Sequence, residues 1–527
     1  MKNYEEFLQE EVSARLDITK IRDNKSFSEI FSIDNIPLFW FYKRYLLQHV
    51  LPKPLNTYPQ LLKTTPLTAS QKIKLSLTSL TMRKYLKLRE RKKILHSKKD
   101  IQPTTAPKAL FLTYPEHLRE GNSLYRIQGI IDAYAQQNIL EPFTLFATQL
   151  SSKKKIDANF NTIYQYCDPE LIAQAQNTAV NLAKEWKNMP ENTKERLFSY
   201  NNNTDYDYLN PAFSFLMSYE FLLTLCTYYL ACKKIIQTQN IKVCFISGQN
   251  GIFERCLAAA SKTKNIPCIL VPHGFSIGNL PAQDVLTNMY LPVFNKTTAS
   301  NFIKNGVPKG QIKVTGPAMY DNIINYLKKK HPERMVLLLT QPLIEDNMAD
   351  KETYFQFLKE VLEQIIEIDN IQLTIKLHPR EQYLETYLEL VDKLQKNKKL
   401  NQKKITVVQN GNNDTLYSLL SKTSVALNFN ATAGILEASI LDIPSINFPY
   451  NKQKSPKYGP FDPSIYVFDI KQLKQTIEQC LSNPKINQKK RKAMVKEYCT
   501  YLDVKSSQRI VEWTYQLLHL NVPKNKY

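Results

Sequence analysis

The sequence is poor in glycine and lacks the glycine-rich motifs of common nucleotide enzymes. It has 12 glycines among 527 residues, well below the usual share of about 7%. No G-x-G-x-x-G motif, P-loop or H-E-x-x-H motif occurs. These absences disfavour a dinucleotide dehydrogenase, a P-loop kinase and a zinc protease of the zincin type.

Paired cysteines and a secretory start are also missing. The eight cysteines are scattered, with no C-x-x-C pair and no histidine at metal-ligand spacing, so neither a zinc site nor a disulfide framework is indicated. We expect reduced, mostly buried thiols. The first residues are acidic and amphipathic, unlike a secretory signal. We therefore expect a cytoplasmic protein that needs no metal or other cofactor.

Acidic residues are outnumbered, and the formal net charge is +22. Such an excess favours an anionic partner, although lysine-rich solvated helix faces would give the same count. The segment from Arg83 to Lys99 mixes basic residues with leucine and isoleucine, which indicates peripheral binding to an anionic membrane, on its inner face, or else an exposed helix. It has no RNP or helix-turn-helix pattern, so we expect no nucleic-acid partner.

The order of apolar runs predicts an α/β fold with two Rossmann-like domains facing a cleft, of the GT-B type, and a helical N-terminal extension. Ten short apolar runs alternate with amphipathic stretches after Thr105. The apolar stretch Phe213 to Cys232 contains Glu220, which favours one buried helix packed on a sheet over a membrane span. We predict these regions: 1–105 helical and basic, 106–325 first domain on the acceptor side, 326–490 second domain on the nucleotide side, and 491–527 C-terminal helices.

Glycine is concentrated where the first domain should present its ligand edge. Seven of the twelve glycines lie between Gly248 and Gly316. His273 follows a buried strand and precedes Gly274, so it can reach the domain's ligand edge as a general base, or else be a loop-packing histidine. Gly248 and Asn250 end another strand and could bind phosphate through backbone amides.

The second domain has polar residues after two of its predicted strands. Lys376, His378 and Arg380 alternate at the end of one strand and supply donors for a phosphate or diphosphate, unless His378 is a chance histidine at a proline-ended strand. Thr340 and Gln341 end the first strand of this domain and are candidates of the same kind.

A turn of small residues precedes the next helix and suits an anion. It comprises Asn430, Ala431, Thr432, Ala433 and Gly434. Free amides and the positive end of the helix dipole favour a phosphate there. Glu437, about one turn further, can accept the hydroxyls of a ribose, or else act as a carboxylate that only offsets the helix dipole.

Four segments together resemble a known family. These are PHGF, VTGPAMYDNI, KLHPRE and ATAGILEASILDIPSINFP, within about residues 240 to 450. They are similar to bacterial GT-B glycosyltransferases that build capsule, lipopolysaccharide or teichoic-acid-like surface polymers. The resemblance implies that His378, Thr432 and Glu437 lie against the donor nucleotide, and that His273 is the acceptor-side catalytic residue.

We therefore expect a metal-independent glycosyltransferase that moves a sugar from a UDP- or CMP-linked donor to a glycan or lipid-linked acceptor. Alternatives are a CDP-polyol phosphotransferase of the same fold, a non-catalytic membrane scaffold, and a UDP-N-acetylglucosamine 2-epimerase-like enzyme. The epimerases share the VTG and TAG elements, but PHGF stands where they have acidic motifs. A metal-dependent transferase would rest on the D-x-D match of Asp205 and Asp207, in an asparagine-rich loop.

Overall fold

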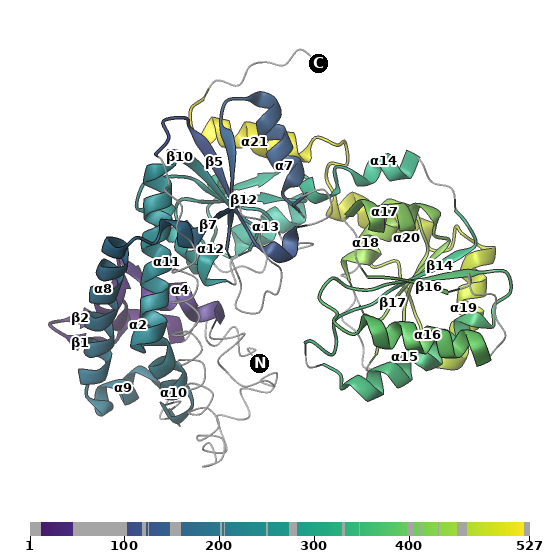
Figure 1. Ribbon diagram of the computed structural model, residues 1–527, viewed down its shortest axis with the longest axis horizontal. Coiled ribbons are helices and arrows are strands. Elements are labelled where there is room, and N and C mark those ends of the chain that lie inside the picture. The colour runs from purple at the N-terminus through teal and green to yellow at the C-terminus, as the bar shows by residue number, and fades with distance from the viewer. Residues whose placement is uncertain are drawn as a thin grey trace.

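The chain folds around two parallel sheets, each covered by helices (Figure 1). The computed structural model describes residues 12–45, 103–118, 123–124, 126–147, 160–200, 203–204, 206–248, 251–272, 282–328, 332–346, 348–397, 405–409, 413–430, 432–450 and 461–520. The predicted α/β class with two Rossmann-like domains is confirmed by these sheets. The predicted domain boundaries stay a prediction.

The first domain is built on a seven-stranded sheet with the order β13-β12-β11-β10-β5-β6-β7, in which every neighbouring pair is parallel. Its strands are β5 (Lys108–Thr113), β6 (Glu141–Phe146), β7 (Asn161–Thr162), β10 (Ile241–Ile246), β11 (Cys268–Leu270), β12 (Met289–Val293) and β13 (Ile312–Val314). The strand order reverses between β5 and β10. In open α/β sheets, ligands bind beyond the carboxyl ends of the strands at such a switch point.

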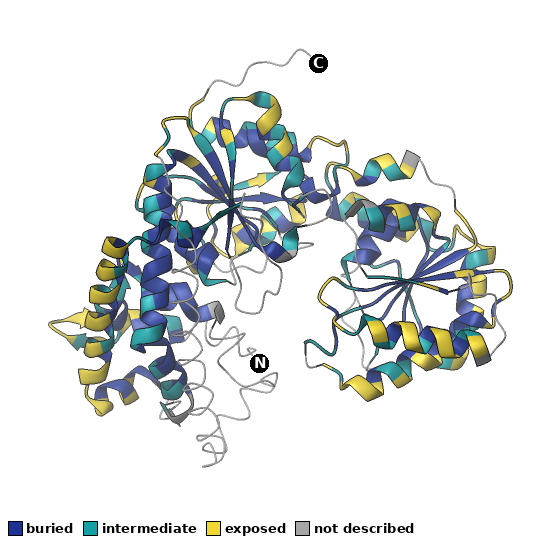
Figure 2. Cartoon of the chain, viewed as in Figure 1, coloured by how far each residue is buried: buried dark blue, intermediate teal, exposed yellow. Residues whose placement is uncertain are grey.

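Helices cover both faces of this sheet. They are α7 (Gln128–Gln137), α8 (Pro169–Asn188), α9 (Glu191–Leu197), α10 (Tyr206–Leu216), α11 (Tyr219–Thr238), α12 (Ile252–Lys262) and α13 (Lys296–Lys304), with short 3-10 turns η3 (Pro115–His117), η5 (Ile163–Tyr166), η6 (Ala282–Asp284), η7 (Lys309–Gln311) and η8 (Ala318–Tyr320). A small hairpin, β8 (Ser199–Tyr200) and β9 (Asn203–Thr204), precedes α10. The strands are largely buried, whereas α8 exposes one face (Figure 2).

The second domain repeats the same winding on a six-stranded parallel sheet with the order β16-β15-β14-β17-β18-β19. Its strands are β14 (Met335–Leu339), β15 (Gln372–Lys376), β16 (Ile405–Val408), β17 (Val425–Asn428), β18 (Ser445–Asn447) and β19 (Ile465–Tyr466). Its helices are α14 (Ile323–Lys328), α15 (Lys351–Ile366), α16 (Leu384–Asn397), α17 (Asn413–Lys422), α18 (Ala433–Ile440), α19 (Ile470–Ser482) and α20 (Gln488–Tyr498). When the six strands are numbered in chain order, their order in the sheet is 3-2-1-4-5-6, which is the Rossmann order. Its switch point lies between β14 and β17.

The described part of the N-terminal region combines helices with two small hairpins. It contains α2 (Ser13–Ile18), β1 (Lys20–Arg22), β2 (Lys25–Ser26), α3 (Phe27–Ile30), β3 (Ser32–Ile33), β4 (Ile36–Pro37) and α4 (Leu38–Tyr45). Both hairpins turn on Asp-Asn pairs, 23–24 and 34–35, with φ between 47° and 61°. Two consecutive left-handed residues make the type I′ turn that hairpins favour, and aspartate and asparagine tolerate that conformation.

This N-terminal segment shares the core of the first domain. The ring of Phe39 stacks on Phe213 of α10 at 5.8 Å. Lys43 and Arg255 both pair with the fully buried carboxylate of Asp284, and the Arg255 guanidinium lies 4.7 Å from the centre of the Trp40 ring. The segment is therefore packed into the first domain and is not a separate element.

The apolar stretch Phe213 to Cys232 spans two helices instead of one. α10 ends at Leu216 and α11 begins at Tyr219, where Ser218 caps it by accepting from the Phe221 amide. Within the described residues no single helix is long and apolar enough to span a membrane. Helices α10 and α11 meet that length and apolarity only when they are taken together, and they are bent by 52° relative to each other. Most of α11 is buried in the first domain's core, as the prediction of a buried helix required. All eight cysteines are buried free thiols, as predicted.

The last helix, α21 (Ser506–Leu517), returns to the first domain and lies beside α7 (Figure 1). Its residues Ile510, Val511 and Tyr515 are buried in the same cluster as strands β5 and β10. Tyr134 of α7 bonds Thr514 and meets the Tyr515 ring at 5.5 Å. The second domain is thus an insertion between β13 and α21 of the first.

Candidate functional site

The switch point of the second sheet brings predicted residues together. Thr340 and Gln341 follow β14, and Asn430 follows β17, the neighbouring strand at which the order reverses. The Asn430 side-chain amide donates to the Gln341 side-chain oxygen at 3.1 Å. Polar groups from separate strands therefore meet at the edge where parallel α/β sheets bind ligands.

Helix α18 starts directly at this edge without a side-chain cap. Thr432 occupies the N-cap position, but its hydroxyl donates to the Asn428 side-chain oxygen at 3.0 Å instead of accepting from the helix. A Cβ on Gly434 would lie 2.5 Å from Leu339 Cδ1, so glycine is what lets the helix approach β14. Ala433 is half-buried beside it. The first amides of α18 thus have no side-chain acceptor in their own cap and suit an anionic group.

Glu437 lies on α18 one turn further along. It is 5% exposed, and its carboxylate has no hydrogen-bond or ion-pair partner within the described part of the chain. Burial raises the pKa of this carboxyl to about 7. A buried carboxyl without a partner is costly, and such groups are concentrated at functional sites.

The three predicted phosphate donors at the carboxyl end of β15 do not converge. Lys376 is buried and its ammonium donates to the carbonyls of Leu377 at 3.0 Å and Gln409 at 3.1 Å. Arg380 is exposed and forms a two-pronged ion pair with Asp346, at 2.8 and 2.9 Å. His378 is half-buried between them, and its Nδ1 accepts from the Arg380 amide at 3.2 Å. Their roles in phosphate binding stay predictions.

Sequence analysis did not single out Glu381, which lies beneath the His378–Arg380 turn. It is 5% exposed. Its carboxylate accepts from the Thr340 hydroxyl, from the His378 amide at 2.5 Å and from the Tyr387 hydroxyl at 2.5 Å. Burial raises its pKa to about 7 although these hydrogen bonds lower it. The only sign of it in the sequence was its position, three residues after His378.

A second overlooked carboxylate lies at the switch point of the first sheet. Tyr114 follows β5 and donates to Glu254 of α12 at 2.5 Å. Glu254 is 5% exposed, and burial raises its pKa while the bond from Tyr114 lowers it. Gly248, half-buried after β10, has room for a Cβ 3.6 Å from this carboxylate, whereas a Cβ on Gly251 would overlap it. The glycines of the SGQNG segment therefore enclose a buried acid.

Several predicted residues lie outside the described residues. These are His273, Gly274, Asn250, Ala431, Asp205 and the basic segment from Arg83 to Lys99. Their proposed roles as base, acceptor-side groups, metal ligand and membrane contact are expectations from the sequence.

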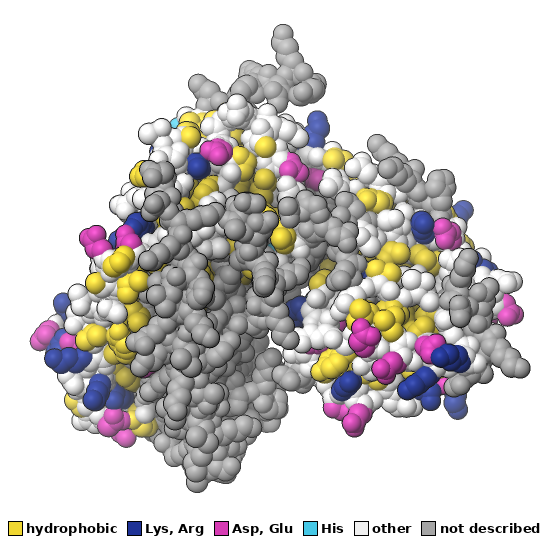
Figure 3. Space-filling model, viewed as in Figure 1, with side chains coloured by type: hydrophobic (Ala, Val, Ile, Leu, Met, Phe, Trp, Pro, Cys, Tyr) yellow, Lys and Arg dark blue, Asp and Glu magenta, His cyan; other side chains and the backbone are white. Residues whose placement is uncertain are grey.

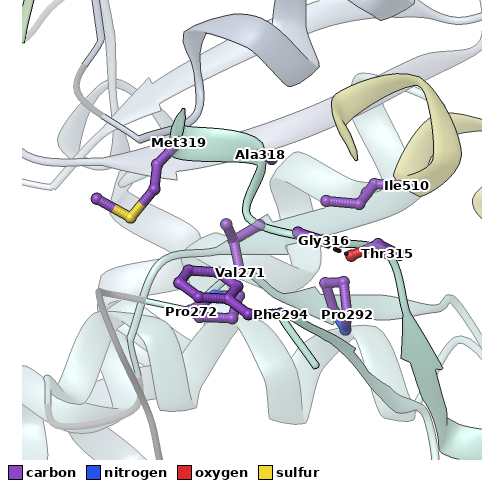
Figure 4. A pocket seen from close by; sticks show the side chains of 9 residues that line it. All are labelled: Val271, Pro272, Pro292, Phe294, Thr315, Gly316, Ala318, Met319 and Ile510. Atoms are coloured by element: carbon purple, nitrogen blue, oxygen red, sulfur yellow. Dashed lines mark hydrogen bonds between the residues drawn. The ribbon is translucent and has the colours of Figure 1, made fainter. Parts of the chain in front are cut away.

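A narrow crevice lies at the carboxyl ends of β11, β12 and β13 (Figure 4). Its lining is mostly apolar and includes Val271, Phe294, Met319 and Ile510. The Thr315 hydroxyl there donates to the Gly316 carbonyl at 3.1 Å. Among the described residues the crevice leaves no room for a water molecule.

Charges of both signs are interspersed on the face of the second domain seen in Figure 3. The exposed ion pairs described in this domain include Lys396 with Asp392 and Lys422 with Glu333. In the described part of the chain, no three histidine, cysteine, aspartate or glutamate side chains gather as a metal-binding group. The candidate site consists of the buried carboxyls and the amide groups that lie at the switch points of the two sheets.

Residues 286–514 match the model of the UDP-N-acetylglucosamine 2-epimerase family, which is less than half of the chain. The match includes every predicted nucleotide-side residue, from Thr340 to Glu437, and none of the predicted acceptor-side residues. It supports the coarser statement that the chain is an enzyme acting on a nucleotide-linked sugar. No curated protein matches the sequence.

Solved structures with a similar chain path include two epimerases and one polymerase. A putative UDP-N-acetylglucosamine 2-epimerase from Listeria monocytogenes is 10% identical, with a TM-score of 0.47 over 80% of this chain and 100% of that one. The enzyme from Neisseria meningitidis is 13% identical, with a TM-score of 0.47 over 78% and 100%. The wall teichoic acid polymerase TagF is 12% identical, with a TM-score of 0.45 over 85% and 97%. Likenesses this distant do not bear on the reaction.

The prediction of a glycosyltransferase is wrong, because the family match is to the epimerases. Three of the four segments that suggested a transferase, VTGPAMYDNI, KLHPRE and ATAGILEASILDIPSINFP, lie within the matched residues 286–514. Short segments of this kind do not identify the reaction.

Proposed function

We propose that the chain is an epimerase that acts at carbon 2 of UDP-N-acetylglucosamine or a closely related nucleotide sugar. The family match at residues 286–514 supports this proposal. The observation that carries it is Glu437, a buried carboxyl that no described residue hydrogen-bonds or pairs with, beside the Rossmann switch point and within the matched segment. We propose that the product is used in surface-polysaccharide synthesis, because the sequence motifs resemble those of enzymes that build surface polymers.

The nucleotide would lie on the second domain. The Glu437 carboxylate would accept hydrogen bonds from the ribose hydroxyls, which are partners that the described residues do not offer it. The uncapped start of α18 after Thr432 would take the diphosphate. Gln341 and Asn430, already bonded to each other at 3.1 Å, would close the other side.

The proton chemistry would need groups from the first domain. Carbon 2 has no neighbouring carbonyl, so the electron pair of its C–H bond must form a C1–C2 double bond as UDP leaves carbon 1. Return of UDP to carbon 1 and of a proton to the other face of carbon 2 completes the epimerisation, so one group takes a proton and another returns one. A group with a pKa near the working pH does this best. We assign such a role to the Glu254–Tyr114 pair, because burial raises the pKa of the carboxyl and the Tyr114 hydroxyl donates a hydrogen bond to it.

The proposal is tested by incubating the full chain with UDP-N-acetylglucosamine in D₂O and recording proton NMR spectra. We expect the signals of the C2 epimer to appear, with deuterium at carbon 2. Glu437→Gln should lose substrate binding, whereas Glu389→Gln, a change on an exposed face of α16, should not. Absence of both binding and deuterium uptake in the wild type would overturn the proposal, and release of CMP from a CDP-polyol would then identify a phosphotransferase.

A further inference from the structure

Glu381 joins the carboxyl ends of three neighbouring strands. Its carboxylate accepts from the hydroxyl of Thr340, after β14, and from the amide of His378, after β15. Its backbone carbonyl accepts from the Gln409 side chain, after β16, at 3.0 Å. Glu381 thus bonds two of the residues that the sequence placed at the nucleotide site.

A second set of contacts ties the same carboxylate to the helices. The Tyr387 hydroxyl of α16 donates to it at 2.5 Å, and the Tyr354 hydroxyl of α15 lies 2.7 Å from that of Tyr387. Both tyrosines are 1% exposed. Within the described residues, no lysine or arginine pairs with Glu381, so three hydrogen-bond donors alone stabilise its charge.

This arrangement fixes the turn that carries His378. The His378 amide also lies 3.2 Å from the Thr340 hydroxyl, so amide, hydroxyl and carboxylate form a closed set. A charged carboxylate oxygen, Oε2, accepts from both Thr340 and His378. A protonated carboxyl is a weaker acceptor than a carboxylate, so it holds both groups less firmly.

We propose that Glu381 is a positioning residue of the nucleotide site, whose charged form holds Thr340 and the His378 turn in the geometry that binds the diphosphate of a UDP-linked sugar. This inference rests on the proposed function. It makes nucleotide-sugar affinity fall as the pH drops and the carboxyl takes up a proton.

The charged neighbours of Glu381 influence this titration in known directions. Glu345, on the loop between β14 and α15, disfavours the Glu381 charge, whereas the bonds from Thr340, Tyr387 and the His378 amide favour it. The nearby Arg380 is neutralised by Asp346. Protonation of the His378 imidazole would strengthen anion binding at low pH, which is the opposite trend.

The experiment measures affinity for UDP-N-acetylglucosamine by calorimetry from pH 5.5 to 8.5. This probe has no terminal phosphate, whose second ionisation near pH 6 would otherwise contribute. Glu381→Gln should bind about tenfold more weakly at pH 8, as expected for loss of a charge-assisted hydrogen bond. It should also lose the part of the pH dependence that Glu381 supplies.

Tyr387→Phe separates positioning from a structural role. It removes a bond that lowers the pKa of Glu381, so the midpoint of the affinity loss should move to higher pH. Tyr354→Phe removes only the outer hydroxyl and should leave affinity at pH 8 within about twofold. The proposal is overturned if Glu381→Gln binds as the wild type does at pH 8, or if Tyr387→Phe leaves the midpoint unchanged.

Hydrogen exchange of the His378 amide distinguishes this inference from the proposed function. Its protection, corrected for the intrinsic rate, should fall between pH 8 and pH 6 in the wild type, and should be low at both pH values in Glu381→Gln. If the wild type does not bind the nucleotide sugar, the proposed function fails. Unchanged protection would refute the coupling of Glu381 to the turn whether or not the ligand binds.

Discussion

The hydroxyl of Tyr114 donates a 2.5 Å hydrogen bond to the carboxylate of Glu254, and both residues are more than nine-tenths buried. No lysine or arginine of the described residues forms an ion pair with that carboxylate. The pair lies at the switch point of the first sheet, which is where a substrate held by the second domain would need a proton donor or acceptor. The ionisation of this carboxyl should make the stability of the fold depend on pH.

Glu254→Gln should gain stability relative to the wild type as the pH rises from 5 to 8. Burial raises the pKa of Glu254 in the folded state, so the folded protein holds a proton that the unfolded chain releases at lower pH. The stability that this proton provides is present at low pH and is lost as the pH rises. Glutamine does not titrate. Urea denaturation at the two pH values measures the difference.

Two phenylalanine substitutions provide the matched comparison. Tyr114→Phe removes the bond that lowers the Glu254 pKa, so its cost in stability should be larger at pH 8 than at pH 5. Tyr164→Phe removes a buried bond to the Tyr228 hydroxyl, 3.1 Å away, and should cost the same at both. Equal behaviour of the two variants would contradict the assignment.

Glu437→Gln should stabilise the ligand-free protein at pH 8. The carboxyl has a pKa of about 7 in the folded state because of burial, against an ordinary value near 4.3. The folded state is therefore penalised once the pH exceeds the unfolded value, by up to about 3 kcal/mol at pH 8. The gain should vanish at pH 4. A gain in stability together with loss of nucleotide binding is the signature of a functional buried charge.

Gly251→Ala should destabilise the first domain by about 2 kcal/mol or more. An added Cβ would overlap the Glu254 carboxylate and lie 2.8 Å from the Tyr114 hydroxyl. Gly310→Ala is the control, because a Cβ there would meet nothing within 4 Å. Its effect should be within about 0.5 kcal/mol. Thermal unfolding of both variants measures the difference. If Gly251→Ala leaves the stability unchanged, the Glu254 side chain can move to make room for the added Cβ.

Asp321→Ala should loosen helix α21 from the joint between the domains. The Asp321 carboxylate accepts from the amides of Ser506 at 3.1 Å and Ser507 at 2.8 Å, and so caps a helix whose own N-cap residue, Lys505, supplies no side-chain bond. Loss of a cap costs about 1 kcal/mol. Lys505→Ala should be neutral. Hydrogen exchange of the first turn of α21 should increase only in the Asp321 variant.

The long apolar runs of the two sheets could be predicted from the sequence because buried parallel strands leave an uninterrupted pattern. Strands β14, β15 and β17 are examples, with nearly every residue buried. The edge strands β7, β13 and β19 have two or three residues each and leave no such pattern. The N-terminal hairpins could not be predicted from an apolar pattern, because their strands have only two or three residues around each Asp-Asn turn.

The site was predicted less completely, because contacts across the chain decide it. Spacing alone suggested that Lys376 and Arg380 act together, yet Gln409 and Asp346, from other segments, draw them apart. Glu254 and Glu381 look like ordinary helix or loop acids in the sequence. Only the fold brings Tyr114 and Thr340 to them and gives them their burial.

The return of α21 to the first domain also sets an order of events during synthesis. Ile510, Val511 and Tyr515 complete the core that β5 and β10 begin, and they are translated after the entire second domain. A ribosome-bound chain ending before Ser506 would hold a second domain able to fold beside a first domain that still exposes the surface for α21. The first domain to be made is therefore the last to be finished, and a chaperone that shields apolar surface would meet it in that interval.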